Sequence, residues 1–414
     1  MVGYFQGSGS NSFDANPASL DDDGLYSTPN SDEYWLSQPA IIQSRDGFII
    51  KLDSNGNFVW ARQISNPTGA AANEDITAIR VDSNGDIYMV GNYILADFDP
   101  DPNVSNVLTA DNCAASNADS FLLKITSSGV FAWVKTFIGT GGITKPNDLA
   151  IDASNNIYIV GQFIGSIDLN PDPTATANFT SNVNYDVYLA KYDSNGNYLW
   201  ANTFGSTAAD IPNVVKVLSS GVYIGGYVSG VTDFDPSSGV NSITPSGSID
   251  GFVSKFSTSG TYQFTNTYGG ATTSIDQVND IEEMNGTVLI TGDFAGTADF
   301  DTGAGVAFAT ANGKDIFLVK ISSTGNYMQH LVYGDLGTED NGKLEILNGN
   351  KIMVYGAFQS TGINVNPFSG VAAFSNIAQR DIFWSVISES FLANNDITKT
   401  PKNFGIYPNP AVDF

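Results

Sequence analysis

The sequence predicts an all-β fold, a β-propeller of about six four-stranded blades, and two observations carry this prediction. First, one phrase occurs six times: an Asp, any residue, an aromatic residue and, in five copies, a Lys three positions later. The aromatic positions are 73, 67, 64, 65 and 66 residues apart, in the order Phe48, Phe121, Tyr188, Phe252, Phe317 and Phe383. Such a period indicates one supersecondary unit copied around a ring or along a rod. Second, each period holds four short apolar runs without a helical period between them.

The second period shows the four expected strands and their connections. Its first run, 76–81, alternates apolar and polar residues as a half-buried strand does. The next four residues, 82–85, read Asp-Ser-Asn-Gly, a hairpin turn in which Gly supplies a positive φ. A second strand follows at 87–93 and leads into a long loop at 96–119. The third strand at 121–125 and the fourth at 130–137 are joined by a tight turn at 127–129.

The same turn and glycine signals return in the other periods. Related turns lie at 53–56, 152–155, 193–196 and 257–260, and a glycine follows the second strand at Gly91, Gly161, Gly226, Gly292 and Gly356. The Asp-Ser-Asn-Gly turns superficially resemble EF-hand calcium loops, but they lack a third ligand at the next odd position and a closing Glu. We therefore interpret them as hairpin turns.

A propeller fits this repeat better than other repeat architectures do. A β-helix would need shorter rungs and separate sandwiches about 100 residues per unit, whereas four antiparallel strands per unit are typical of a propeller blade. We place the 76–81 type of strand innermost, so the chain begins at the second strand of a blade. The first blade then lacks its innermost strand and the last blade its outermost, which predicts a chain truncated at both ends. We expect a propeller at 1–388, a linker at 389–402 and the beginning of another domain at 403–414.

This strand order also places the connections. Both tight turns of a blade fall on one face of the disc. The long loops, near 11–45, 96–119, 165–185, 230–249, 296–313 and 360–380, fall on the opposite face. Because loops on a rigid scaffold commonly carry recognition, we expect a ligand on the long-loop face.

Composition limits the partners that the chain can have. With 43 acidic and 17 basic residues the net charge is −26, which argues against nucleic acid and anionic lipid surfaces, since both need clustered Lys and Arg. Such a charge favours solubility in a salty exterior. No stretch approaches the roughly 18 apolar residues of a membrane span. Cys113 is the only cysteine, so an intrachain disulfide is excluded, and the first residues lack the basic and apolar regions of a signal peptide.

The repeat resembles the bacterial β-propeller repeat that is abbreviated SBBP. The motifs that carry this resemblance are Asp-x-Phe-x-x-Lys, Asp-Ser-Asn-Gly-Asn-x-x-Trp, Ile-Tyr-x-x-Gly and Asp-Phe-Asp-Pro, and together they cover nearly all of 1–388. Each motif is short, so the resemblance depends on their order and repetition. It implies a propeller fold.

A second resemblance lies in the tail. Tyr407, Pro408, Asn409 and Pro410 resemble the opening of the C-terminal sorting domain of the type IX secretion system of Bacteroidota. The resemblance implies export across the outer membrane by the type IX secretion machinery, followed by surface attachment or release. It also implies that the chain stops inside such a domain.

The most suggestive candidate site is a paired-Asp motif in the long loops. The second period carries it as Asp97-Phe98-Asp99-Pro100-Asp101, and the equivalent polar residues in later periods are Asp168, Asn170, Asp172, Asp233, Asp235, Asp299, Asp301, Asn364 and Asn366. In an extended segment the carboxylates point to one side and the Phe or Leu between them to the other, where it can plug the core between blades. The carboxylates suit Ca²⁺, which prefers hard oxygen ligands. They can also cap the turn by accepting backbone N–H groups, and of the two interpretations we favour capping.

Two further series occupy fixed slots in the blades. A Lys series could bind an anionic glycan, but we favour Lys stems that lie along the sheet and pair with a local Asp; its members are Lys51, Lys124, Lys191, Lys255 and Lys320. Aromatic residues could offer platforms for sugars, but we favour packing between blades; these are Trp60, Trp133, Trp200 and Phe264.

Signals of catalysis are weak. His330 is the only histidine, which excludes a multi-His metal site and nearly excludes a His-based triad. The glutamates are scattered, whereas hydrolysis by a carboxylate pair needs two acidic groups at matched positions. We therefore expect a propeller that is secreted or at the outer-membrane cell surface, is not an enzyme, and binds or displays for contact with protein, glycan or matrix.

Two alternatives remain open from the sequence. The propeller could be an ancillary or catalytic domain of a secreted polysaccharide-degrading enzyme, and Asp, Glu, Lys and Tyr converging at the central channel would favour this. It could instead be a structural spacer of a larger surface protein. The absence of an exposed concave patch on the long-loop face would favour the spacer.

Overall fold

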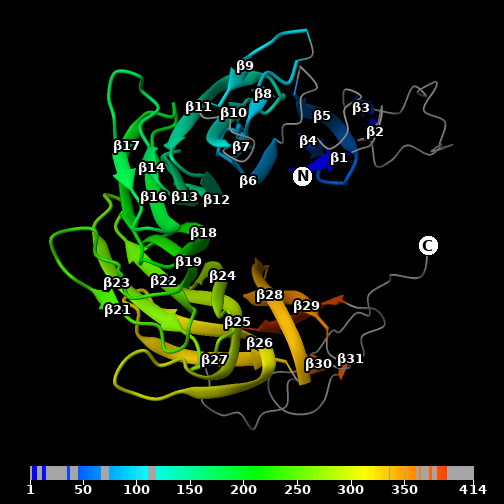
Figure 1. The fold of residues 1–414 in the computed structure, drawn as a ribbon. Helices are drawn as coiled ribbons and strands as arrows, with labels where there is room; N and C mark the ends of the chain where they lie inside the picture. Colours follow the sequence, from blue (N-terminus) through cyan, green and yellow to red (C-terminus); the bar gives the residue numbers. More distant parts are fainter. Residues whose placement is uncertain are drawn as a thin grey trace. The chain divides into compact units, whose positions relative to one another are not determined.

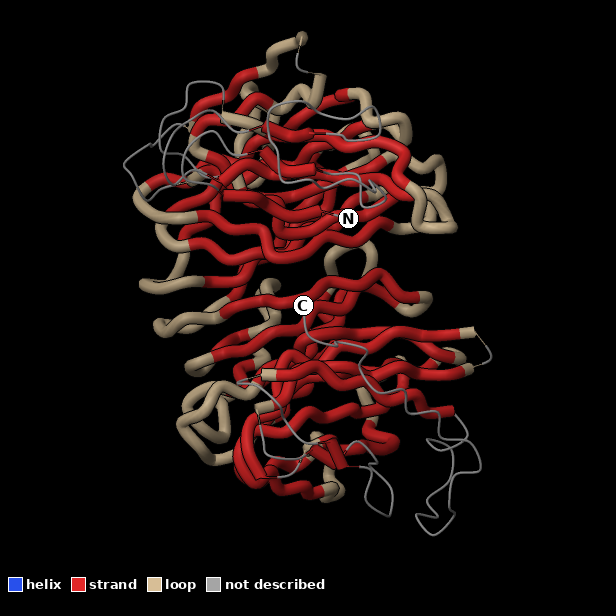
Figure 2. The backbone as a smooth tube through the Cα atoms, turned by 90° about the vertical axis from the view of Figure 1, so that its right-hand side faces the viewer, coloured by secondary structure: helices blue, strands red, loops and turns tan. Residues whose placement is uncertain are grey.

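The structure is a computed structural model that describes residues 2–6, 12–14, 35–37, 45–66, 74–101, 103–110, 118–334, 336–348, 350–359, 363–364, 373–374 and 380–388. The regular elements of these residues are all β-strands (Figure 2), and the same residues contain no helix of the length and apolarity that crossing a membrane requires. The chain divides into two compact units. The first unit consists of Met1–Ser181 and Tyr188–Ala201, and the second of Asn182–Val187 and Asn202–Phe414.

Three successive antiparallel sheets begin in the first unit (Figure 1). In the order in which the strands lie in each sheet, they are β1 (Val2–Gln6), β4 (Arg45–Leu52) and β5 (Phe58–Ile64); β6 (Asp75–Val81), β7 (Ile87–Tyr93), β10 (Asp119–Ile125) and β11 (Phe131–Thr140); and β12 (Thr144–Ile151), β13 (Ile157–Phe163), β16 (Asp186–Tyr192) and β17 (Tyr198–Phe204). The far end of β11 also pairs with β14 (Ser166–Asp168) and so extends the second sheet.

Three further sheets follow in the second unit. They contain β18 (Ile211–Leu218), β19 (Gly221–Val228), β22 (Asp250–Phe256) and β23 (Tyr262–Tyr268); β24 (Gln277–Met284), β25 (Thr287–Asp299), β26 (Phe308–Ser322) and β27 (Tyr327–Tyr333); and β28 (Leu336–Leu347), β29 (Lys351–Phe358) and β32 (Asp381–Ser388). A short parallel pairing of 312–314 with 336–338 joins the last two sheets.

These sheets confirm the predicted fold class, an all-β propeller of four-stranded blades. The strand that we expected to be innermost forms one edge of its sheet, as β6, β12, β18 and β24 do. In the first unit β6 lies against β12, and in the second unit β24 lies against both β18 and β28, as strands nearest a common axis do. Among the described residues the first and last sheets have three strands each, as the strand order predicts.

The segments that we expected to be long loops contain small hairpins. Their strands are β2 (Ser12–Asp14) with β3 (Trp35–Ser37), β8 (Leu95–Asp97) with β9 (Val107–Thr109), β14 (Ser166–Asp168) with β15 (Asn178–Thr180), β20 (Thr232–Asp233) with β21 (Ser242–Ile243), and β30 (Ile363–Asn364) with β31 (Ala373–Phe374). In the fifth blade the far ends of β25 and β26 form the same hairpin. Three-residue strands are too short to give a clear alternation of polarity, so the sequence did not reveal them.

The recurring glycine lies inside the second strand rather than after it, and in two blades it makes room for the aromatic residue of the repeat phrase. Gly91 pairs with Phe121 across β7 and β10, and Gly292 pairs with Phe317 across β25 and β26. A Cβ at either glycine would lie 2.8 Å from the partner ring and 1.9 Å from a backbone oxygen of the first strand. Both distances are too short, so the glycine and the aromatic residue act as one packing unit.

The structure confirms the predicted turns and the packing role of the tryptophans. Asp82 accepts the backbone N–H of Gly85 at its carbonyl oxygen (3.0 Å). The turn glycine of the next blade, Gly129, packs against Trp60, because a Cβ added at Gly129 would lie 3.2 Å from the Trp60 ring. Trp60 is therefore a packing surface for the neighbouring blade.

Candidate functional site

The paired-Asp motifs form the tips of the small hairpins, and their carboxylates hold the tip backbone. In the β8–β9 hairpin, Oδ1 of Asp97 accepts hydrogen bonds from the backbone nitrogens of Asp99 (3.1 Å) and Asn106 (2.8 Å). Oδ1 of Asp99 accepts from the nitrogen of Asp101 (3.0 Å), and Oδ1 of Asp101 from that of Asn103 (2.9 Å). Each carboxylate thus caps a turn that begins at its own residue.

The same pattern recurs in three later hairpins. The first Asp of each motif accepts two backbone N–H groups: Asp168 from Asn170 (3.0 Å) and Ala177 (2.8 Å), Asp233 from Asp235 (3.1 Å) and Asn241 (2.8 Å), and Asp299 from Asp301 (3.1 Å) and Ala307 (2.7 Å). The next turns are capped by Asp172 (to Thr174, 2.9 Å), Asp235 (to Ser237, 3.0 Å) and Asp301 (to Gly303, 2.9 Å). Asn170 makes the equivalent bond with its amide oxygen (3.0 Å), so the turn does not need a negative charge.

The apolar residue between the paired polar residues is buried, as we predicted. Phe98, Leu169, Phe234 and Phe300 are all 0% exposed. The alternation of an extended segment therefore directs the carboxylates to the tip and the apolar residue into the core.

Calcium binding at these tips stays a prediction. One oxygen of each of the nine candidate aspartates accepts a backbone N–H group, and across the described part of the chain no three His, Cys, Asp or Glu side chains are grouped so that they could hold a metal ion. The capping contacts suffice to explain why Asp and Asn occupy these positions.

Asp299 provides the test that separates capping from calcium binding. We expect Asp299→Ala to lower the free energy of unfolding by about 1–3 kcal/mol, because two backbone N–H groups lose their acceptor. Asp299→Asn should cost less than about 1 kcal/mol, because an amide oxygen can accept both bonds. Chemical denaturation measures both values. A chelator-dependent loss of stability in the wild-type chain, with Asn as damaging as Ala, would instead indicate calcium.

The hairpin tips lie beside the first residue of the fourth strand of their own blade. The hydroxyl of Tyr262, at the start of β23, accepts a hydrogen bond from Nδ2 of Asn241. Burial raises the pKa of Tyr327, at the start of β27, and the charges of Asp301 and Asp299 raise it further. The prediction that long loops and tight turns occupy opposite faces is therefore wrong for the tips. The paired strands fold each long segment back until its tip reaches the turn between the third and fourth strands.

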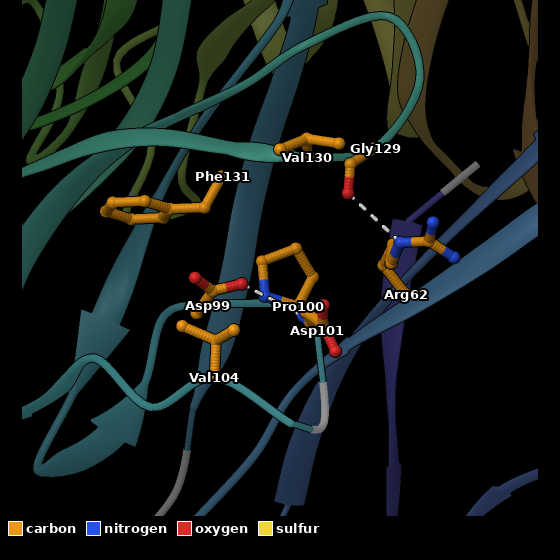
Figure 3. A pocket seen from close by; sticks show the side chains of 8 residues that line it. All are labelled: Arg62, Asp99, Pro100, Asp101, Val104, Gly129, Val130 and Phe131. Atoms are coloured by element: carbon orange, nitrogen blue, oxygen red, sulfur yellow. Dashed lines mark hydrogen bonds between the residues drawn. The ribbon is translucent and has the colours of Figure 1, made fainter.

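A pocket in the first unit is built from this arrangement (Figure 3). It has a volume of about 390 Å³ and is lined by Arg62, Asp99, Pro100, Asp101, Val104, Gly129, Val130 and Phe131. Figure 3 shows Asp99 and Pro100 between Val104 on one side and Val130 with Phe131 on the other. The pocket thus combines apolar walls with three ionisable side chains.

Arg62 is held in place by backbone oxygens. Its Nε donates to the carbonyl oxygen of Gly129 (3.0 Å), its Nη1 donates to that of Ala61 (2.7 Å), and its guanidinium carbon lies 5.3 Å from the centroid of the Trp60 ring. The hydrogen bonds from Asn103 lower the pKa of Asp101, and the charge of Arg62 lowers it further. Asp101 is therefore ionised near neutral pH.

The members of the Lys series make several kinds of contact, and ion pairs are only one of them. Lys124 pairs with Asp86 at 3.0 Å, as expected, but Lys51 donates to the carbonyl oxygen of Ser127 (2.6 Å) in the next blade. Three members also lie over Tyr rings of the second strand, with the Nζ–centroid distances Lys124–Tyr88 4.9 Å, Lys191–Tyr158 4.9 Å and Lys255–Tyr223 5.4 Å. Their placement matches cation–π and backbone contacts rather than a basic stripe.

A second set of carboxylates, which inspection of the sequence did not single out, is buried at the junction of consecutive blades. The Asp of the repeat phrase lies near the acidic residue that precedes the next first strand, giving the pairs Asp46–Glu74, Asp186–Asp210 and Asp250–Asp276. All six side chains belong to residues that are at most 5% exposed. The acidic residue directly before the first strands β6, β18 and β24 was the signal available in the sequence.

Four of these carboxylates, those of Glu74, Asp186, Asp210 and Asp276, have raised pKa values. Burial raises the pKa of Glu74 to about 9, and repulsion from Asp46 and Asp75 adds to the effect. Burial likewise raises the pKa of Asp276 to about 7 and that of Asp186 to about 6. Backbone N–H groups offset only part of this effect in Asp276, whose two oxygens accept bonds of 2.8 Å each.

The first strands of the second unit carry a charged cluster. Lys216 on β18 forms ion pairs with Glu282 and, at 3.6 Å, with Asp280 on β24. Burial raises the pKa of Tyr355, and the charges of Asp280 and Glu345 raise it further. Acidic, basic and Tyr side chains therefore converge on the strands nearest the expected axis.

Several predicted residues cannot be placed. Tyr407, Pro408, Asn409 and Pro410, as well as Asn366, Cys113 and the segments 389–402 and 403–414, lie outside the described residues.

The repeated four-stranded sheets define the class: the chain is a β-propeller repeat protein. No family model matches it. Over 166 residues it is 25% identical to an uncharacterized WD repeat-containing protein of Acanthamoeba polyphaga mimivirus, a match that covers 38% of this chain and 12% of the viral protein's length. Among solved structures it is similar to the WD40 domain of Neurospora crassa Pan2, with a TM-score of 0.33, 10% identity, and coverage of 70% of this chain and 75% of that domain.

Proposed function

We propose that this propeller is a non-catalytic binding or display module for contact with glycan, protein or matrix outside the cell. The pocket between Arg62, the 99–104 tip and Phe131 carries the proposal. It is a concave patch on a rigid scaffold, with few polar groups among apolar walls, as small ligand sites usually are. A purely structural spacer would not need such a patch.

An extracellular location is the second part of the proposal. Its support is the resemblance of Tyr407, Pro408, Asn409 and Pro410 to a type IX sorting domain, together with the net charge of −26. We expect the chain, when fused to a full sorting domain, to reach the surface of a host that has this secretion system. Retention in the periplasm, measured by cell fractionation, would count against the assignment.

A screen of the intact chain tests the binding function. Glycan arrays and pull-downs from extracellular material should both use the whole chain, with Arg62→Ala as the comparison, because this change empties one wall of the pocket. A ligand that the wild-type chain retains and the variant loses would support the proposal. If no ligand binds in either format, the spacer becomes the better interpretation.

The charged cluster around Lys216 favours a second candidate function, hydrolysis of a polysaccharide. Glu282 has a pKa that burial raises, as a general acid would need. However, Lys216 neutralises Glu282, and Asp280 accepts the backbone N–H of Ile281 (3.0 Å), so the cluster also serves to hold β18 against β24. Release of reducing ends from soluble polysaccharides, abolished by Glu282→Gln, would establish the enzymatic alternative.

A further inference from the structure

We propose that the pocket lined by Arg62, Asp99, Asp101 and Phe131 binds an amino sugar, a pyranose residue with a protonated amine. This inference deepens the proposed binding function and depends on it. It commits to one ligand chemistry, a cationic sugar rather than a neutral or acidic one.

The charges that line the pocket favour a cation. Two carboxylates, those of Asp99 and Asp101, line the pocket together with one guanidinium group, that of Arg62. The guanidinium already donates to the carbonyl oxygens of Gly129 and Ala61, whereas each carboxylate uses Oδ1 for its capping bonds. In the described residues no further donor contacts Oδ2 of Asp99 or Asp101, so these two oxygens are available to a ligand.

The walls favour a ring over an extended side chain. Pro100 is buried, the Phe131 ring is half-buried, and Val104 and Val130 are 50% and 58% exposed at the rim. The apolar face of a pyranose can lie on such a wall while its polar edge faces the carboxylates. A lysine side chain offers only one ammonium group. An amino sugar offers an ammonium group to one carboxylate and hydroxyl donors to the other.

The same electrostatics disfavour acidic sugars. A uronate or a sulfate would place its charge near Asp99 and Asp101, and Arg62, whose Nε and Nη1 already donate to backbone oxygens, has one positive charge against these two carboxylates. Asp101 is exposed, so the attraction to a cation is moderate and should weaken with salt.

The next hairpin supplies a matched control. Asp172 occupies the position that corresponds to Asp101, caps its turn in the same way through Thr174 (2.9 Å), and faces Lys135 in place of Arg62. Asp172→Asn and Asp101→Asn therefore change the total charge of the protein equally. Only Asp101 lines the pocket.

The experiment is calorimetric titration of the whole chain with a glucosamine trisaccharide and, separately, an N-acetylglucosamine trisaccharide, at mildly acidic pH and low salt. We expect the amino form to bind at least tenfold more tightly than the acetylated form. Asp101→Asn should weaken binding about three- to tenfold. Phe131→Leu should weaken it although the charge is unchanged, and Asp172→Asn should leave it unchanged. Thermal melts confirm that each variant is folded.

Three outcomes would overturn the inference: equal affinity for the two trisaccharides, an equal effect of Asp101→Asn and Asp172→Asn, or full affinity in Phe131→Leu. The second outcome would mean attraction to the net charge of −26 rather than to a site. If neither trisaccharide binds while the screen of the intact chain finds another ligand, the amino-sugar inference fails and the binding function stands. If that screen finds none, the binding function itself fails.

Discussion

Phe300→Ala is expected to lower the free energy of unfolding by about 3–5 kcal/mol, a cost typical of removing a buried aromatic side chain. Phe300 is 0% exposed and sits at the tip of the β25–β26 hairpin. Its ring centroid lies 5.2 Å from those of Phe294 and Phe317 and 4.8 Å from that of His330. Deleting the ring would open a cavity among these aromatic neighbours, and urea denaturation of the variant measures the loss.

Phe308→Ala is the matched control for this prediction. It removes the same side chain from the opposite strand of the same hairpin, but Phe308 is 64% exposed. Its expected cost is within about 0.5 kcal/mol. Equal effects of the two substitutions would show that Phe300 does not anchor the hairpin in the core.

The stability of the protein should fall as the pH rises from about 5 to about 9. Glu74 has a pKa of about 9 in the folded protein against an ordinary value of 4.5, so the folded state holds a proton that the unfolded state has lost over this range. A raised pKa contributes stability in full below the unfolded value, and the contribution disappears as the pH approaches the folded value. Each such group lowers the free energy of unfolding by about 1.4 kcal/mol per pH unit within its window.

Glu74→Gln should flatten this dependence between pH 7 and 9. Asp186, with a pKa of about 6, has completed most of its titration by pH 7, and Asp276, with a pKa of about 7, has done so by about pH 8, so Glu74 dominates the upper part of the range. Glu345→Gln is the control, since Glu345 is exposed. Denaturation at several pH values measures the slopes. A wild-type slope of zero above pH 7, or identical slopes in the two variants, would contradict the prediction.

The sequence could predict the blades because each depends on local patterns that repeat. The Asp-x-Phe-x-x-Lys phrase, the glycine of the second strand and the Asn-Gly turns each mark one element, and together they predicted the strand order that β6, β7, β10 and β11 show. The pairing of Gly91 with Phe121 explains why the two signals recur together: a side chain at one position would occupy the space of the other.

The candidate site was predicted only in part. The paired aspartates were found, and so was the burial of Phe98 between them, because both follow from alternation in an extended segment. The sequence could not predict that each hairpin tip lies beside the start of the fourth strand, as the 99–104 tip does beside Phe131 of β11. This placement depends on hairpin strands such as β8, three residues long, which leave almost no periodic signal. Arg62 was missed because it lies on β5 and reaches the pocket from a neighbouring blade, a contact that no local pattern records.

The sequence by itself determined the all-β class, the repeat and the chemistry of the turns, since these depend on residues that are neighbours along the chain. Only the tertiary structure decided which carboxylates are buried in pairs, as Asp46 is with Glu74, and which stand at an open pocket, as Asp101 does. The physical reason is that burial and electrostatic repulsion depend on distances between blades, and the local sequence does not encode the distance between residues that are far apart along the chain.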